Sequence, residues 1–226
     1  MDQIPIKQKK LQEVLDSLTD DFLNDTIIDL CNTEMYVTKD SLISEEIHPC
    51  SDEYFNKART FPVPQYAFPR ACRGISENAL HASDYGKYDT IRNSMKKMVK
   101  YLGVTRNALS MVYPDNGYIG WHHNGNASGF NILLTYSIDG DGYFKYYDYS
   151  SENFVVLQDN PGWNVRVGYY PDENKHPDKV FWHCAETKKK RITAAFVIQH
   201  RGMWEDFIEE ISCGEYDKSI LSKHKF

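Results

Sequence analysis

The sequence lacks the features of secreted, membrane-spanning and disulfide-bonded proteins. Its five cysteines are odd in number, widely spaced and form no C-x-x-C pair, so neither a disulfide framework nor a structural zinc site is expected. The first residues, MDQIPIKQKKLQ, lack the apolar stretch of a signal peptide, and nowhere do about eighteen apolar residues follow one another. These absences predict a soluble cytoplasmic protein with reduced thiols and no membrane partner.

Positive charge is also scarce. The chain has 26 lysines and arginines against 32 aspartates and glutamates, which gives a formal net charge of −6. Binding to phosphate backbones needs a basic surface, so this charge disfavours bulk nucleic-acid binding without excluding a local basic groove. What the chain does have is length for one well-buried core and 14% aromatic residues, which suit the faces of β-sheets.

Residues 1–105 carry mainly helical signals. Apolar residues recur at helical spacing over about residues 7–18 and predict an amphipathic helix. A second helix is expected from Asp89, which can cap it, to Gly103, which can end it. The proline-rich stretch FPVPQYAFPRACRGI between them must be extended or irregular, because proline lacks the backbone donor. We expect this region to pack on the core that follows.

From about residue 106 to 202 the pattern changes to short strands separated by turn residues. The expected strands are Ser110–Tyr113, Phe130–Ile138, Tyr143–Tyr147, Phe154–Leu157, Val165–Tyr170, Val180–His183 and Arg191–Gln199. Strands at intervals of about ten residues are typical of a sandwich or closed roll. Residues 203–226 should add a short helix and a tail. The predicted fold class is α+β with a mainly β core, a jelly roll flanked by helices.

The segment Trp121-His122-His123-Asn124 is the most informative one for chemistry. In an extended strand residues i and i+2 point to the same face, so His122 and Asn124 can converge while His123 faces away. A third ligand must come from elsewhere, and His183 ends another expected strand. Two imidazoles and one oxygen leave the other side of a metal open, which is the arrangement of non-haem Fe(II) oxygenases.

Arg191 follows His183 after a short lysine-rich turn. We expect it to lie on the strand beside His183 and to point into the barrel. A guanidinium there can hold a carboxylate through two parallel hydrogen bonds. Tyr113, on the strand before His122, could add a hydroxyl donor. A dicarboxylate that binds a metal through its keto-acid end would present its far carboxylate to this arginine.

The run W-H-x-N, a second histidine and then an arginine resembles the Fe(II)/2-oxoglutarate-dependent dioxygenases, most closely their AlkB-like and prolyl-hydroxylase-like branches. The resemblance covers about residues 108–200. It implies a double-stranded β-helix, in agreement with the strand count. It further implies that His122 and His183 ligate iron. Arg191 would anchor the distal carboxylate of 2-oxoglutarate, with Tyr113 as its hydroxyl partner, and O₂ would be the second co-substrate.

One departure from that family concerns the metal. Its motif is H-x-D, whereas this chain has Asn124, a neutral and weaker ligand that leaves one more positive charge on the metal. Three interpretations follow: the amide oxygen still ligates, water or halide takes the position, or the site is no longer catalytic. A register shifted to His123 would also leave the position empty. Trp121 favours His122, because it precedes the histidine as in the family pattern.

Two further departures, Met111 and Val197, replace an asparagine and an arginine of the AlkB branch and argue against a close relative. The resulting hypothesis is a 2-oxoglutarate- and Fe(II)-dependent oxygenase, a hydroxylase of a protein side chain, a nucleobase or a small molecule. The main alternative is a catalytically degenerate jelly roll that serves as a binding module. A third keeps the fold but binds another divalent ion through His122 and His183.

Overall fold

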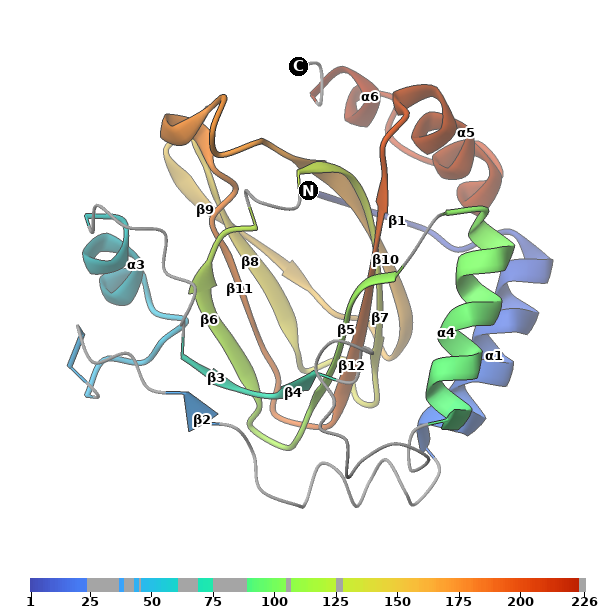
Figure 1. The fold of residues 1–226 in the computed structure, drawn as a ribbon, viewed down its shortest axis with the longest axis horizontal. Coiled ribbons are helices and arrows are strands. Elements are labelled where there is room, and N and C mark those ends of the chain that lie inside the picture. Colours follow the sequence, from blue (N-terminus) through green and yellow to red (C-terminus); the bar gives the residue numbers. More distant parts are fainter. Residues whose placement is uncertain are drawn as a thin grey trace.

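Two antiparallel sheets face each other and form a jelly-roll core with helices outside it (Figure 1). The computed structural model describes residues 1–23, 37–38, 43–44, 46–60, 69–74, 89–104, 107–124 and 128–223. Within them, sheet A has the strand order β1-β10-β7-β12-β5-β4 and sheet B the order β2-β3-β6-β11-β8-β9. The strands are β1 (Asp2–Ile4), β2 (Val37–Thr38), β3 (Arg70–Ala71), β4 (Arg73–Gly74), β5 (Asn107–Tyr113), β6 (Tyr118–His122), β7 (Gly129–Ser137), β8 (Tyr143–Asp148), β9 (Asn153–Gln158), β10 (Gly162–Tyr170), β11 (His183–Glu186) and β12 (Arg191–Ile198).

From β5 onward the chain passes repeatedly from one sheet to the other. It goes from β5 in sheet A to β6 in sheet B, returns for β7, crosses again for β8 and β9, and returns for β10. The last crossing leads from β11 in sheet B to β12 in sheet A. This alternation encloses an interior between the sheets, and it confirms the predicted α+β class with a jelly-roll core.

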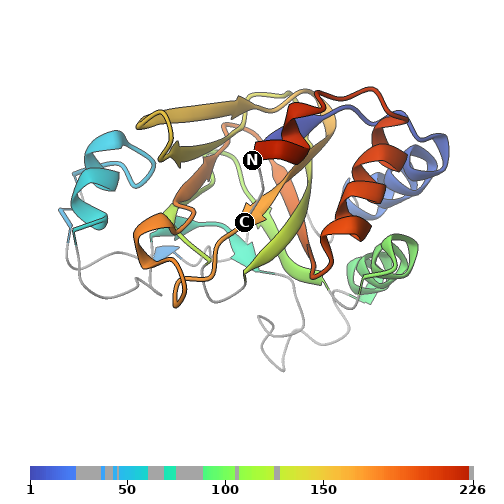
Figure 2. The ribbon, with the colours of Figure 1, turned by 90° about the horizontal axis from the view of Figure 1, so that it is seen from above.

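Helices cover the outer face of each sheet (Figures 1 and 2). They are α1 (Lys9–Leu23), α3 (Asp52–Ala58), α4 (Asp89–Leu102), α5 (Arg201–Ser212) and α6 (Ser219–Lys223). Because side chains alternate along a strand, Ile132 and Leu134 of β7 pack toward α1, α4 and α5, whereas Leu133 points into the roll. The largest apolar cluster therefore lies outside sheet A, and the interior keeps room for polar groups. Among the described residues, no helix has the length and apolar character that crossing a membrane requires.

The helix predictions are confirmed with small differences at the ends. The helix expected over residues 7–18 is α1, the one expected after Asp89 is α4, and the C-terminal helix is α5. Gly103 ends α4 with φ +63°, a left-handed conformation that glycine adopts without strain. Part of the proline-rich stretch, residues 61–68, lies outside the described residues.

Some strand predictions were wrong. Residues 1–105 were expected to be helical or irregular, yet β1 to β4 extend both sheets. These strands have two or three residues each, too few to show an alternating pattern. The expected strand Val180–His183 is misplaced, because β11 begins at His183. Val180 and Trp182 are apolar because they pack against α3 on the outside of sheet B.

Candidate metal and organic-acid site

His122 and His183 meet on the inner face of sheet B. His122 ends β6, His183 begins β11, and the two are direct partners in the antiparallel register. The next paired residues are Ile119 and Ala185, so β6 carries one extra residue between the two pairs. This β-bulge turns both Ile119 and His122 toward the interior, and Trp121 between them packs outward against α3. The ring centroids of the histidines lie 4.1 Å apart.

Backbone carbonyls hold both imidazoles in the tautomer that a metal needs. Nδ1 of His122 lies 2.8 Å from the oxygen of Gly120, and Nδ1 of His183 lies 2.9 Å from the oxygen of Phe181. A carbonyl only accepts, so each Nδ1 carries the proton and each Nε2 keeps its lone pair. Burial lowers the pKa of His122 to about 4 and that of His183 well below its ordinary value. Both rings are therefore neutral at neutral pH and ready to ligate.

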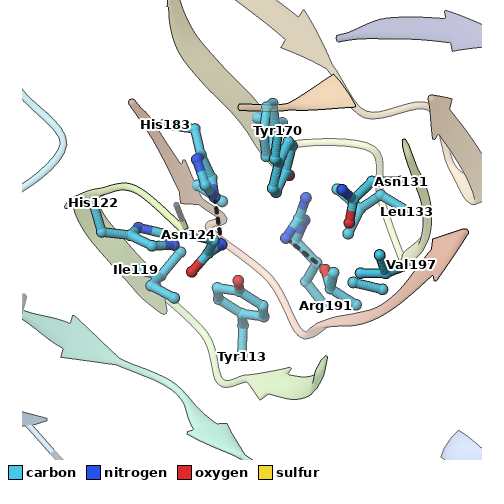
Figure 3. Close-up of a pocket in the computed structure, with 14 residues that line it drawn as sticks. Tyr113, Ile119, His122, Asn124, Asn131, Leu133, Tyr170, His183, Arg191 and Val197 are labelled. Atoms are coloured by element: carbon cyan, nitrogen blue, oxygen red, sulfur yellow. Dashed lines mark hydrogen bonds between the residues drawn. The ribbon is translucent and has the colours of Figure 1, made fainter. Parts of the chain in front are cut away.

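Asn124 lies next to the two histidines, but it does so from a loop and not from the strand face that was expected. β6 ends at His122, so the two residues do not share a regular strand face. The loop nevertheless brings Nδ2 of Asn124 within 3.3 Å of Nε2 of His183. In Figure 3, Asn124 lies between the two imidazoles and Tyr113. His123 faces away, with Nδ1 3.4 Å from a carboxylate oxygen of Glu173 and its ring beside Trp182.

Arg191 approaches from the opposite sheet. Sequence reasoning placed it on the strand beside His183; this was wrong, because β12 pairs with β5 and β7 in sheet A. Its side chain is 1% exposed and points into the cavity that the histidines also line. Its register partner is Tyr113, whose ring centroid lies 5.0 Å from the guanidinium carbon. The metal-ligand candidates and the acid-binding candidates thus face each other across the roll.

Three nitrogens of Arg191 have different surroundings. Nε donates to Oδ2 of Asp159 at 2.8 Å, and Nη1 donates to Oγ1 of Thr193 at 2.9 Å. Nη2 is buried and makes no hydrogen bond within the described part of the chain. Burial opposes the charge, but Asp159 and the Tyr113 hydroxyl outweigh it and raise the pKa of Arg191. The side chain is thus a fixed cation with one donor group left for a ligand.

A cavity of about 110 Å³ joins these groups (Figure 3). A single water needs about 10–15 Å³ on this measure, so the cavity has room for a small organic acid. It is lined by Tyr113, Ile119, His122, Asn124, Asn131, Leu133, Phe144, Tyr170, His183, Ala185, Arg191, Thr193, Ala195 and Val197. Polar groups at its two ends are separated by apolar walls, a distribution that suits a ligand with an acid group at the arginine end and a metal-binding group at the histidine end.

Aromatic side chains form the wall around His183. The rings of Phe144 and Tyr170 lie 5.3 Å from its ring, and that of Phe181 lies 5.4 Å away. Met1 packs behind this wall in one cluster with Phe144 and Tyr170. These contacts keep bulk water from the imidazole of His183 and contribute to its low pKa.

Sequence reasoning missed two charged residues behind the cavity. Asp159 and Arg166 are buried, and Asp159 was assigned no role. One signal could have found Arg166: it stands in the middle of the expected strand Val165–Tyr170, where a charge among buried neighbours needs a partner. The pairing with Asp159 could not be read from the sequence alone.

Another group in the described part of the chain has metal-ligand chemistry. Ligand atoms of His48, Cys50 and Glu186 lie within 4.8 Å of one another. The thiol of Cys50, however, contacts the carbonyl oxygens of Ile119 and Ala185, and burial raises its pKa. A thiol that keeps its proton is a poor ligand, so this group is a weaker candidate than the histidine pair.

No family model and no curated protein sequence matches this chain. Solved structures do resemble it. A 2OG-Fe(II) oxygenase-family oxidoreductase of Burkholderia pseudomallei is 10% identical, covering 87% of this chain and 95% of that one, with a TM-score of 0.39. A full-length Neurospora crassa protein in complex with alpha-KG is 12% identical, covering 87% and 73%, with a TM-score of 0.35. A Pseudomonas putida prolyl-4-hydroxylase is 13% identical, covering 58% and 70%, with a TM-score of 0.33. Identities and TM-scores this low carry no argument about the activity of this chain.

Proposed function

We propose that this chain is an oxygenase that uses Fe(II) and 2-oxoglutarate to hydroxylate a further substrate. One observation carries the proposal: two neutral imidazoles, each held through Nδ1 by a backbone carbonyl, share a cavity with a buried arginine that has an unused donor. Each half alone is common in proteins. Together, a metal-binding end and a carboxylate-binding end define a ligand that has a chelating group and a distal acid.

The residues present fit these groups. Imidazole nitrogens and an amide oxygen are acceptable ligands for Fe(II), and three protein ligands leave positions for other molecules. Asn124 would have to turn its oxygen toward the metal, because its Nδ2 now faces His183. At the other end, Nη2 of Arg191 fits a carboxylate, since an unpaired guanidinium donor in a buried place is costly.

Each protein group then has a definite role. With Fe(II) bound, O₂ would be the oxidant: one of its oxygen atoms would enter the further substrate, and the other would enter the succinate that forms with CO₂ from 2-oxoglutarate. Arg191 would hold and orient the acid, and the carbonyls of Gly120 and Phe181 hold the imidazoles. Phe144, Tyr170 and the other aromatic residues would exclude water.

An anaerobic titration tests the proposal. The metal-free protein receives Fe(II) and then 2-oxoglutarate, and the weak visible charge-transfer band of the chelate is recorded. We expect a saturable band that disappears in His183→Gln and weakens in Arg191→Met. His176, which is exposed, and Arg201, which is partly exposed, provide the matched controls His176→Gln and Arg201→Met, which should keep the band. A folded wild-type protein that binds Fe(II) and 2-oxoglutarate no better than His183→Gln would contradict the proposal.

One observation favours a second candidate, a binding module without turnover. Asn124 stands where the family has a carboxylate, and its amide hydrogen-bonds the lone pair of His183. Such a module would bind metal and acid yet form no succinate. Succinate release, measured with panels of peptides, nucleobases and small molecules, distinguishes the two. Wild-type protein without succinate release, together with Asn124→Asp protein that releases it, would support the module.

A further inference from the structure

Asp159 bridges two buried arginines next to the cavity. Its Oδ2 accepts from Nε of Arg191 at 2.8 Å, and its Oδ1 accepts from Nη2 of Arg166 at 2.5 Å. All three side chains are 0–1% exposed. The backbone of Gly142 packs closely against Asp159, because a Cβ at Gly142 would lie 2.5 Å from Oδ2 of Asp159. We call Arg166, Asp159 and Arg191 the charge bridge.

The charge bridge carries one positive charge in excess. Two adjacent guanidinium groups outweigh the effect of burial and lower the pKa of Asp159, so this carboxyl is ionised. Arginine keeps its proton in proteins even when buried. The three groups therefore sum to two positive charges and one negative. Excess charge in a buried place is unfavourable unless an anion compensates it.

The unused donors indicate where such an anion binds. Nη2 of Arg191 and both Nε and Nη1 of Arg166 lack hydrogen-bond partners within the described residues. Of the charge bridge only Arg191 lines the cavity, beside Thr193 and Tyr113. A carboxylate in the cavity can thus reach Arg191 directly. Arg166 can act on it only through the charge it adds behind Asp159.

The charge bridge both orients the guanidinium of Arg191 and keeps a net positive charge beside the cavity. Asp159 fixes the guanidinium of Arg191, because Nε can donate to only one acceptor direction. A single aspartate would also neutralise that arginine and weaken its attraction for a ligand. A second buried cation on the far oxygen of the aspartate leaves the group positive while the orientation is kept.

We propose that Arg166 is a positioning residue that restores the positive charge Asp159 takes from Arg191, so that the Arg191 end of the cavity binds one carboxylate of a dicarboxylate even without metal. The identity of the dicarboxylate as 2-oxoglutarate rests on the proposed function. The inference itself concerns the acid end of the cavity and needs no iron.

Glutarate is a suitable probe, because it has two carboxylates and no keto-acid group to chelate a metal. Its affinity for the metal-free protein is measured by calorimetry in Arg166→Gln, Arg166→Lys and the double variant Asp159→Asn/Arg166→Gln. The glutamine side chain of Arg166→Gln can still donate to Asp159 but has no charge, and lysine keeps the charge. Arg201→Met, which removes a partly exposed arginine on α5, is the matched control.

We expect Arg166→Gln to weaken glutarate binding about tenfold or more, because buried charges interact strongly over several ångströms. Arg166→Lys should stay within about threefold of the wild type, since one charge is worth the same on either side chain. The double variant regains the net positive charge and should bind more tightly than Arg166→Gln. Circular dichroism and thermal unfolding confirm that each variant is folded. Glutarate affinity in folded Arg166→Gln equal to the wild type, or no recovery in the double variant, would overturn the inference.

The same samples separate this inference from the proposed function. Wild-type protein that binds glutarate without metal but gives no chelate band with Fe(II) and 2-oxoglutarate contradicts the proposed oxygenase activity. It does not contradict the proposed role of Arg166. A normal chelate band with equal 2-oxoglutarate affinity in wild type and Arg166→Gln contradicts only the proposed role of Arg166. Wild-type protein that binds neither acid overturns both.

Discussion

His122 and His183 are direct register partners at the β-bulge of β6, with ring centroids 4.1 Å apart. Both candidate ligands therefore depend on the pairing of two neighbouring strands in sheet B, whereas Arg191 depends on sheet A. Any change in how the sheets sit against each other alters the distance between the metal end and the acid end. The packing that holds sheet B in place is thus part of the site.

Gly120 is a tightly enclosed backbone position within that packing. A Cβ there would lie 2.8 Å from the carbonyl oxygen of Pro69 and 2.9 Å from Cβ of Pro49. We expect Gly120→Ala to lower the free energy of unfolding by about 1–3 kcal/mol, as overpacking does. It should also weaken divalent-metal binding, because the Gly120 carbonyl orients His122. Calorimetric metal titration and urea unfolding measure the two effects.

Gly202 on α5 is the control for this change. A Cβ at Gly202 meets no atom within 4 Å, so Gly202→Ala should keep metal affinity and leave stability equal or raised by up to about 1 kcal/mol. Equal metal affinity in both alanine variants would show that the bulge does not position the histidine.

Acid should destabilise the metal-free protein through its buried histidines. Burial lowers the pKa of His122 to about 4, against 6.5 in an unfolded chain. As the pH falls from about 6.5 toward 4, His122 becomes protonated in the unfolded state but stays neutral in the folded state. The free energy of unfolding therefore falls over this range. For His122 alone the loss is about 3 kcal/mol across this range. Well above pH 6.5 His122 is neutral in both states, and this contribution no longer depends on pH.

Urea unfolding between pH 4 and 7.5 measures this loss. His122→Gln lacks the titrating group and should show a shallower slope, whereas the exposed-site variant His176→Gln should keep the wild-type slope. Parallel curves for wild type and His122→Gln would mean that His122 titrates normally in the folded protein.

Much of the site could be predicted from local pattern. Trp121-His122, the later histidine and the arginine after a short turn are all readable along the chain, and the structure brings the two histidines and the arginine to one cavity. Alternation of apolar residues and regular turns also predicted the strands of the roll. Such features depend on neighbours a few residues apart, which sequence reasoning handles well.

What could not be predicted depends on contacts between distant segments. The bulge at β6 exists because Gly120 and Trp121 donate backbone hydrogen bonds to the carbonyls of Pro69 and Pro49. Sheet membership of Arg191 follows from pairing between β12 and β7, and no local pattern encodes that choice. The ion pairs of Asp159 could not be predicted either, because its partners Arg166 and Arg191 lie on different strands.

Position 124 offers a direct test of metal affinity. Asn124→Asp replaces a neutral amide by a carboxylate next to two neutral imidazoles. A charged oxygen ligand binds a divalent ion more strongly, so we expect Fe(II) affinity to rise about tenfold or more. Anaerobic competition with a chromophoric chelator measures it. Asn174→Asp adds the same charge at an exposed position and should leave the affinity unchanged. Unchanged affinity in both variants would mean that residue 124 does not reach the metal.

Thr193 holds the remaining bound nitrogen of Arg191. Its Oγ1 accepts from Nη1 at 2.9 Å and lies 3.4 Å from Oγ1 of Thr135. Valine has nearly the same shape without the hydroxyl, so Thr193→Val leaves a buried charged donor unpaired. A hydrogen bond to a charged group is worth about 1.5–3 kcal/mol, part of which fixes the guanidinium for the ligand. We expect glutarate and 2-oxoglutarate to bind about three- to tenfold more weakly.

Thr135→Val is the control for this change. It removes the neighbouring hydroxyl and no contact to Arg191, so the variant should bind both acids as the wild type does. Calorimetry at one pH and salt concentration compares the three proteins. If Thr135→Val weakens binding as much as Thr193→Val, the loss comes from packing between β7 and β12 and not from the orientation of Arg191.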